Sequence, residues 1–311
     1  MKSTNILVTG VAGDIGFGAG RILRDWEWRG VLWGADIHAN HAGTRLFDGC
    51  PVAPRAADPA YLGWLGDFVT ANRIGLVLPT SEAEIHALDR TTEIAGARIL
   101  SSSREVVRYG LDKHACLDFL DGRGVAVPEH GLVGQDVPTR FPVIVKPRSG
   151  QGSKGLRRID TPAELDAIEA GALVWQAYLT PDDAEYTCAV FCTREVPARI
   201  MVMRRKLQGG FTGSGEVVDD PAIHQYVARI AEVLSLDGVM NVQLRRTAAG
   251  PLLFEINPRL SSTLVFRDKL GFHDLRWWIA AALGEPVPPY LAPATGTRFF
   301  RGVQEYILPP T

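Results

Sequence analysis

Apolar and polar residues in the first third of the chain alternate between strand-like and helix-like patterns. Apolar runs at residues 5–10, 31–37 and 74–79 are accompanied by helical patterns at residues 16–25 and 82–92. Strands that alternate with helices predict a parallel sheet with helices packed on it. We therefore expect a Rossmann-like α/β domain at residues 1–110.

The pattern changes at residue 112, where short strands begin to dominate. A helix at 113–120 precedes strands at 141–146 and 156–159, and a helix at 163–170 precedes strands at 173–178, 186–192 and 198–206. The strands before the second helix are assigned to one antiparallel sheet and those after it to another. We expect two antiparallel α+β subdomains, a small one at 111–178 and a large one at 179–311.

Two later strands each carry a polar face. The first alternates apolar residues with Asn241, Gln243 and Arg245, and the second alternates Leu252, Phe254 and Ile256 with Leu253, Glu255 and Asn257. If the strands pair, Gln243 comes beside Glu255 and Asn257. Such oxygen atoms suit magnesium, which binds one or two carboxylates together with substrate phosphates. Arg259, just past the second strand, would meet the transferred phosphate. A surface hairpin with a polar outer face is the alternative.

A glycine-rich loop upstream is a second, independent indication of phosphate binding. Lys146 ends the strand before this loop. The loop contains Gly150, Gly152, Ser153 and Gly155. Glycines allow backbone amides to close over phosphates. The loop is not a Walker motif, because its lysine precedes the last glycine and a strand follows where that motif needs a helix.

In combination these residues resemble the ATP-grasp superfamily. The closest resemblance is to the ATP-binding halves of the carbamoyl phosphate synthase large subunit and to single-module carboxylate-amine ligases, and it covers residues 112–285. It implies that Lys113 and Lys146 contact nucleotide phosphates or adenine. It also implies that the glycine loop is a flexible lid.

The resemblance implies the other nucleotide contacts as well. It assigns adenine to the backbone of Gln176, Ala177 and Tyr178, ribose to Glu185, the metal to Gln243, Glu255 and Asn257, and catalysis to Arg259. Ala177 departs from the family pattern, in which an acidic residue is common, and residues 181–183 replace a glycine turn. Neither departure removes a metal or phosphate contact.

A cationic cluster follows on a strand that should border this site. It consists of Arg204, Arg205 and Lys206. We expect Arg204 and Lys206 to hold a substrate carboxylate or the γ-phosphate. A solvated edge strand is the alternative.

The N-terminal glycine turn indicates a different function. Gly10, Gly13 and Gly16 link a strand to a helix, and Asp36 follows about 20 residues later, as in a dinucleotide-binding fingerprint. The main alternative is therefore an NAD(P)-dependent oxidoreductase of the short-chain type, whose Tyr-x-x-x-Lys spacing occurs at Tyr109. That alternative leaves Lys146 and the second glycine loop without a role.

In ATP-grasp enzymes a first domain of this kind commonly holds no nucleotide and forms one wall of the acceptor site. Gly13, Asp14 and residues 79–82 are accordingly candidates for substrate contacts. Ligands gather at the carboxyl ends of parallel strands.

Composition and charge argue against nucleic-acid-binding, membrane-spanning and disulfide-rich classes of protein. The chain has 311 residues, of which 46% are apolar, and its 33 Lys plus Arg against 35 Asp plus Glu give a net charge of -2. There is no basic excess for nucleic acid and no apolar run of the ~18 residues that span a bilayer. The four cysteines are too scattered for a disulfide framework. We expect a cytoplasmic monomer or homodimer without nucleic acid or membrane partners.

The function expected from these features is carboxylate-amine ligation that consumes ATP, with Mg2+ or alternatively Mn2+ as the metal. A substrate carboxylate would be phosphorylated and an amine would displace the phosphate. Cations, glycine amides and oxygen ligands suit this chemistry, because it needs positioning and charge neutralisation. Carbamoyl phosphate synthesis fits poorly, since that synthase uses two such halves and a glutaminase. A catalytically silent ATP-binding module is a further alternative.

Overall fold

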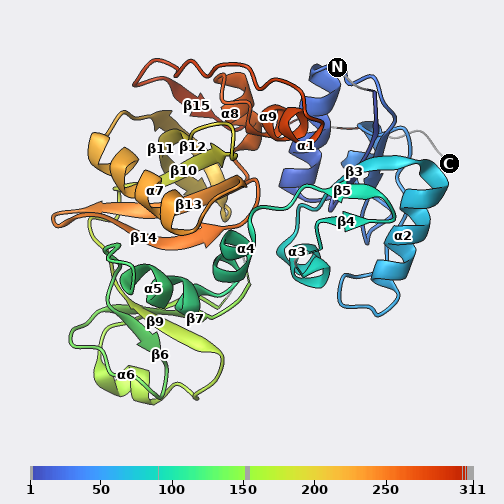
Figure 1. Ribbon diagram of the computed structural model, residues 1–311. Helices are drawn as coiled ribbons and strands as arrows, with labels where there is room; N and C mark the ends of the chain where they lie inside the picture. The colour runs from blue at the N-terminus through green and yellow to red at the C-terminus, as the bar shows by residue number, and fades with distance from the viewer. Residues whose placement is uncertain (1–2, 90, 151–154, 303, 305, 307–311) are drawn as a thin grey trace.

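The chain folds into three units, each built on its own sheet (Figure 1). The computed structural model describes residues 3–89, 91–150, 155–302, 304 and 306. The N-terminal unit lies on one side and the two antiparallel sheets lie on the other, with α4 (Arg104–Gly110) at their junction. None of the helices in these residues has the length and apolar character needed to cross a membrane.

The N-terminal unit is the parallel sheet that the sequence predicts. Its elements are β1 (Asn5–Thr9), α1 (Asp14–Asp25), β2 (Leu32–Ala35), the 3-10 turn η1 (Ala42–Arg45), α2 (Tyr61–Asn72), β3 (Ile74–Leu78), α3 (Glu82–Leu88), β4 (Glu93–Ile94) and β5 (Ala97–Ile99). The strand order is β2-β1-β3-β5-β4, with β4 as an antiparallel edge. Helix α2 was not predicted. Helix α3 is shorter than predicted because Asp89 has a φ of 23° and leaves the helical conformation.

The second unit is a small antiparallel sheet. Its elements are α5 (Lys113–Asp121), β6 (His130–Leu132), β7 (Val143–Pro147), β8 (Arg157–Ile159), α6 (Pro162–Asp166) and β9 (Leu173–Ala177), in the strand order β6-β9-β7-β8. The assignment of residues 173–178 to the following sheet was wrong, because β9 lies between β6 and β7. A strand's partner is set by long-range packing, which the local pattern does not contain.

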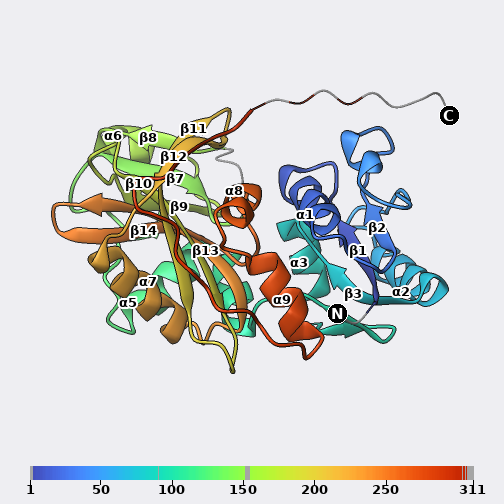
Figure 2. The same cartoon turned by 90° about the horizontal axis from the view of Figure 1, so that it is seen from above.

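The third unit is a large antiparallel sheet with helices on both faces (Figure 2). Its elements are β10 (Glu185–Cys192), β11 (Arg199–Gln208), β12 (Phe211–Val217), α7 (Pro221–Val233), β13 (Gly238–Thr247), β14 (Gly250–Asn257), α8 (Leu264–Lys269), α9 (Asp274–Ala282) and β15 (Arg298–Phe300). Cys188 and Val190 of β10 pack with Ile223 of α7. Ala189 and Phe191 face the other way, into a core shared with α9 and the N-terminal unit.

That second face of the large sheet changes character along its strands. It is apolar where α9 and the N-terminal unit cover it, around Phe191 and Met203. Toward the start of β10 it carries Glu185, and neighbouring strands add Arg205 and Gln243. The apolar part of one face therefore anchors the sheet, while its polar part borders a cavity.

A β-bulge in β14 places some of its side chains on a different face of the sheet from the one predicted. The register places Gln243 opposite Glu255 but Leu244 opposite Leu253, so Phe254 is an extra residue between the two pairs. Leu253 therefore joins Ile256 in the core beneath α7. The expected strict alternation of 252–257 was wrong, because a bulge reverses the side-chain pattern beyond it.

Candidate functional site

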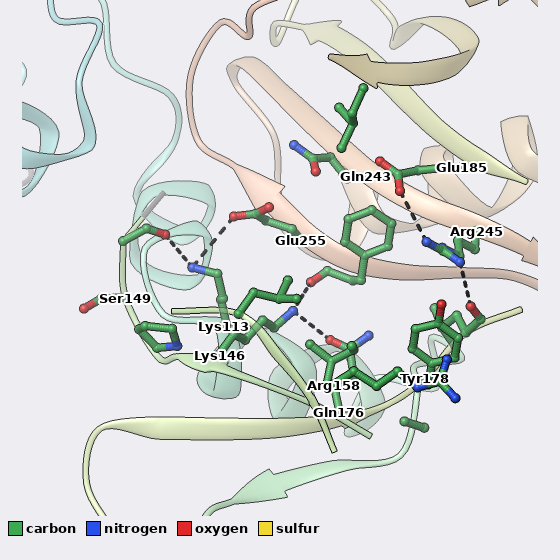
Figure 3. A pocket seen from close by; sticks show the side chains of 18 of the residues that line it. Lys113, Lys146, Ser149, Arg158, Gln176, Tyr178, Glu185, Gln243, Arg245 and Glu255 are labelled. Atoms are coloured by element: carbon green, nitrogen blue, oxygen red, sulfur yellow. Dashed lines mark hydrogen bonds and ion pairs between the residues drawn. The ribbon is translucent and has the colours of Figure 1, made fainter. Parts of the chain in front are cut away.

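A cavity of about 720 Å³ lies between the small and large sheets (Figure 3). Sites for small molecules commonly have volumes of roughly 300–1,000 Å³. The predicted residues that line it are Lys113, Lys146, Gly150, Gln176, Ala177, Tyr178, Glu185, Gln243 and Glu255. These residues come from both sheets, so the tertiary fold brings together most of the predicted nucleotide contacts.

Lys146 lies at the back of this cavity, on β7. Its Nζ donates to Oε1 of Gln176 at 2.9 Å and to the backbone oxygen of Phe254 at 2.7 Å. Burial lowers the pKa of Lys146 to about 8, and Lys113 adds to the lowering while Glu255 opposes it. A buried cation held beside the cavity is suited to bind an anionic group.

Lys113 connects the glycine loop to β14, which carries the predicted metal ligand Glu255. It is the first residue of α5, behind the Asp112 cap. Its Nζ donates to the backbone oxygen of Gly150 at 2.6 Å and lies 3.7 Å from Oε1 of Glu255. The two lysines thus bring positive charge to one end of the cavity, where phosphates would lie.

The glycine loop is described only at its two ends. Gly150 lines the cavity with a φ of 105°, and Gly155 has a φ of 75°, so both adopt backbone conformations that favour glycine. Gly152 and Ser153 lie outside the described residues.

Two of the backbone amides predicted to bind adenine already donate hydrogen bonds to other backbone oxygens of this chain. The amide of Ala177 donates to the oxygen of Glu129, and that of Tyr178 donates to the oxygen of Pro142. Leu179 is the next residue and also lines the cavity. In the described part of the chain no hydrogen bond is recorded for its amide, so Leu179 is a better-placed donor, which the sequence reasoning missed.

Phe254 is a second cavity residue that the sequence reasoning placed incorrectly. Predicted to face the core, it instead lines the cavity because of the bulge. Ile144, Leu156 and Leu179 add further apolar wall. This part of the cavity therefore has one aromatic ring and several aliphatic side chains, a surface against which an aromatic base can pack.

The polar wall of the cavity is an ion-pair network around Glu185. Its carboxylate lies 2.8 Å from Nη2 of Arg205 and 3.5 Å from Nη2 of Arg245. Arg205 also donates to Oε1 of Gln243 at 2.8 Å. The network therefore fixes Glu185 and Gln243, two of the predicted ligand contacts, relative to each other.

Arg205, and not Arg204 or Lys206, belongs to this site. Arg204 pairs with Asp183 at 2.9 Å, and Lys206 is exposed. Successive residues of a strand point to opposite faces, so Arg204 and Lys206 lie on the face away from the cavity. The prediction for these two cations is corrected to Arg205, because the sequence alone did not show which face borders the site.

The predicted metal ligands lie along one face of the β13–β14 pair. Gln243 and Glu255 lie directly opposite each other in the strand pair, and both line the cavity. Asn257 lies opposite Asn241, is buried and does not line the cavity. Nδ2 of Asn257 has no hydrogen-bond partner among the described residues. No group of three His, Cys, Asp or Glu side chains forms a metal cluster in that part of the chain.

This donor set fits magnesium only when it is bound together with a nucleotide. Glu255 contributes one carboxylate, and Gln243 and Asn257 contribute amide oxygens. Magnesium typically uses one or two carboxylates and takes its other ligands from phosphates and water. The residues present therefore fit a metal that arrives with its phosphates.

Arg259 bridges the large sheet and the N-terminal unit. Its Nη2 donates to Oε1 of Glu82 at 2.9 Å, and its Nη1 donates to the oxygen of Leu260 at 3.1 Å. Glu82 is the first residue of α3, at the carboxyl end of the parallel sheet. Arg259 thus lies where the large sheet meets the N-terminal unit.

The N-terminal glycine turn is stabilised from within. A Cβ on Gly16 would lie 2.5 Å from the oxygen of Gly10, so this glycine allows α1 to approach the turn. Asp36 accepts from the amide of Ala12 at 2.8 Å and from that of His38 at 3.0 Å. One carboxylate oxygen of the residue that would bind ribose in a dinucleotide site therefore holds the glycine turn, and the other holds the loop after β2.

The C-terminal segment occupies the start of helix α1. Asp14 pairs with Arg301 at 2.7 Å, and Arg301 also donates to the oxygen of Ser262. This contact links the N-terminal unit to the loop that follows β14. Asp14, predicted to contact substrate, is engaged with the chain itself.

Comparisons with known proteins agree with this geometry. Residues 171–300 match the model of a family described as ATP-grasp in the biosynthetic pathway with Ter operon. None of the curated protein sequences matches the chain. Several solved structures resemble it over nearly its whole length.

Three of those structures illustrate the similarity. N5-carboxyaminoimidazole synthetase from Staphylococcus aureus has a TM-score of 0.74 at 17% identity, with 93% of this chain and 79% of that chain covered. The biotin carboxylase domain of 2-oxoglutarate carboxylase from Hydrogenobacter thermophilus has a TM-score of 0.74 at 15% identity, with 93% and 72% covered. L-amino acid ligase from Bacillus licheniformis has a TM-score of 0.71 at 15% identity, with 91% and 75% covered. The fold class predicted from the sequence is confirmed.

Proposed function

We propose that this chain is an ATP-dependent ligase of the ATP-grasp superfamily that couples a carboxylate to an amine, because residues 171–300 match an ATP-grasp family model and the fold resembles that of L-amino acid ligase. A carboxylate oxygen attacks the γ-phosphorus of ATP, and the bond to ADP breaks. The amine then displaces phosphate from the acyl phosphate and loses a proton. The description of the matched family supports a role in small-molecule biosynthesis.

The observation that carries this proposal is the meeting of Lys113, Lys146 and Glu255 in one cavity between two sheets. The lysines bind phosphates, and Glu255 with Gln243 and Asn257 holds magnesium. When bound, magnesium neutralises phosphate charge during transfer. Such a site accelerates phosphoryl transfer by positioning and electrostatic stabilisation.

The remaining residues bind the rest of the nucleotide. Adenine lies against Phe254 with the Leu179 amide at its edge, and Glu185 binds ribose. Arg259 is the catalytic cation at the junction, with Glu82 holding its guanidinium. ATP enters with its phosphates toward the glycine loop.

Two alternatives make different predictions. In an NAD(P)-dependent oxidoreductase, Asp36 would bind ribose, yet its two carboxylate oxygens accept from the amides of Ala12 and His38. In a silent ATP-binding module the nucleotide would bind without turnover. The intact set of Lys113, Lys146 and Glu255 favours an active enzyme.

One experiment separates these functions. The purified protein is incubated with ATP, Mg2+ and pooled carboxylic acids, with and without pooled amines, and ADP and phosphate are measured. A ligase releases both in equal amounts, and the release depends on the pools. ADP binding without release would indicate the silent module. NADPH binding with neither ADP binding nor release would indicate the oxidoreductase.

A further inference from the structure

A second hollow, of about 670 Å³, adjoins the nucleotide cavity. It lies between α3, α4 and residues 148–150, and it shares Ser149 and Gly150 with the lining of the first cavity. In Figure 1, α3 and α4 face each other across the junction of the units. A molecule in this hollow would reach the phosphate end of the nucleotide cavity, because Gly150 is the residue bonded to Lys113.

The hollow also borders the catalytic arginine. Glu82 lines it and pairs with Arg259 at 2.9 Å. Arg259 follows the metal strand by two residues. The reacting group of a bound molecule would therefore lie at the end of the hollow formed by Glu82, Ser149 and Gly150.

The other end of the hollow carries unneutralised positive charge. Arg104 and Arg108 lie four residues apart on α4, and such residues are neighbours on one face of a helix. Both are exposed, and in the described part of the chain neither has an ion pair. The guanidinium of Arg108 also lies 5.2 Å from the centroid of the Tyr109 ring.

Among the described residues, no acidic residue of the hollow forms an ion pair with Arg104 or Arg108. Glu82 pairs with Arg259, and Asp112 pairs with Arg148 at 2.7 Å. Asp89 lies at the end of α3, and His86 adds a further titratable group to the same wall. Two guanidiniums on one helix face are suited to bind a carboxylate or phosphate through paired N–H donors.

The middle of the hollow is apolar. Ile85, Val107 and Leu111 contribute aliphatic surface to its lining. Leu111 follows the arginines at the end of α4, toward Lys113, whose amide donates to the backbone oxygen of Arg148 next to Ser149. The hollow thus has a cationic end, an aliphatic middle and an end at the reaction site.

We propose that this hollow binds one of the two ligase substrates, and that this substrate carries a second anionic group, a carboxylate or phosphate, held by Arg104 and Arg108. The inference rests on the proposed ligase function, because it assigns a chemical class to a substrate of that reaction. The anionic group lies away from the reacting group, with a short aliphatic part between them.

A kinetic test uses the substrates found in the pooled assay. The reacting pair should contain a compound with a second carboxylate or phosphate, and its uncharged analogue, an amide in place of the carboxylate or an alcohol in place of the phosphate, should have a KM raised about tenfold or more. The double variant Arg104→Gln/Arg108→Gln should raise the KM of the anionic substrate by a similar factor. It should leave the KM of ATP and the KM of the uncharged analogue unchanged. Substrates without a second anion, or a double variant with an unchanged KM, would overturn the proposal.

A binding test is independent of turnover. Glutarate, 3-phosphonopropanoate and pentanoate are titrated calorimetrically into the full chain with ADP and Mg2+ bound. One of the two dianions should bind at least about tenfold more tightly than pentanoate, and the double variant should remove that difference. The two dianions distinguish a carboxylate site from a phosphate site. Equal or absent binding of all three probes would overturn the proposal.

Arg29→Gln is the matched control for both tests. Arg29 is an exposed arginine of the N-terminal unit outside both hollows. This variant should behave as the unaltered protein does. Dianion binding without ATP turnover would reject the ligase function separately from the anion site.

Discussion

Nζ of Lys146 donates a hydrogen bond of 2.7 Å to the backbone oxygen of Phe254, which lies 108 residues further along the chain. The bond joins the small sheet to the large one beside the cavity that lies between them. It is possible because the bulge in β14 leaves Phe254 without a partner in the ladder to β13. The same bulge turns the Phe254 ring into the cavity, so one irregularity in a strand provides both a lysine acceptor and an apolar wall.

Nucleotide affinity should depend on pH through Lys146. Burial lowers the pKa of this lysine to about 8, so it is a cation below that pH and becomes neutral above it. Phosphates are fully ionised above pH ~7.5, since their second pKa is about 6. The Kd for ADP, measured by calorimetry, should therefore rise about tenfold per pH unit above 8.

Lys146→Gln is the test of that assignment. This variant should bind ADP about tenfold or more weakly at pH ~7.5, because a charge-assisted bond is lost. Its Kd should not change between about pH 7.5 and 9.5. A pH dependence that persists in the variant would show that another group titrates.

Phe254→Ala should weaken nucleotide binding. Stacking of a base on an aromatic ring contributes roughly 1–3 kcal/mol, so the Kd for ADP should rise about 5- to 150-fold. The bond to Lys146 should survive, because it uses the backbone oxygen. Phe300→Ala is the control, since that ring is 70% exposed on β15. Equal ADP affinity in the two variants would place adenine elsewhere.

Glu255→Gln should separate binding from turnover. The variant keeps the size of the side chain but removes the carboxylate of the metal site, so ATP turnover should fall about 10²–10³-fold. ADP binding without Mg2+ should persist. Glu216→Gln, on β12 of the same sheet, should retain full activity. If Glu255→Gln also retains turnover, the metal ligands have been assigned to the wrong residues.

Asp36→Ala should affect stability and not nucleotide binding. The carboxylate accepts from the amides of Ala12 and His38, so its loss should lower the free energy of unfolding by about 1–3 kcal/mol. Urea denaturation measures this change. The Kd for ADP should be unaltered. A variant of unchanged stability that loses NADPH binding would instead favour the oxidoreductase.

Local signals in the sequence predicted most single elements correctly. The helix predicted at 113–120 is α5 (Lys113–Asp121), and Asp112 caps it by accepting from the amide of Ala115. The apolar run at β1 and the glycine turn after it also lie where the pattern placed them. Such features depend on neighbours within a few residues, so the sequence alone contains them.

Errors arose where a residue's surroundings come from a distant strand. The partner of β9, the unpaired position of Phe254 and the face of β11 that carries Arg205 all depend on pairings between segments far apart. Periodicity distinguishes the two faces of a strand but does not show which face meets a cavity. For that reason the pattern alone predicts Arg204 and Lys206 as site residues, whereas Arg205 is the one that lines the cavity.

By itself the sequence determined which residue types are available to the candidate site: two lysines, a glycine loop and one carboxylate with amide partners. Their residue types and spacing indicate phosphate and magnesium, whatever the exact packing. Only the tertiary structure decided that Leu179, Phe254 and Arg205 join them and that Arg104 and Arg108 face a neighbouring hollow. The physical reason is that the type of each side chain fixes which groups it can bind, whereas bulges, strand order and contacts between units fix which side chains line a cavity.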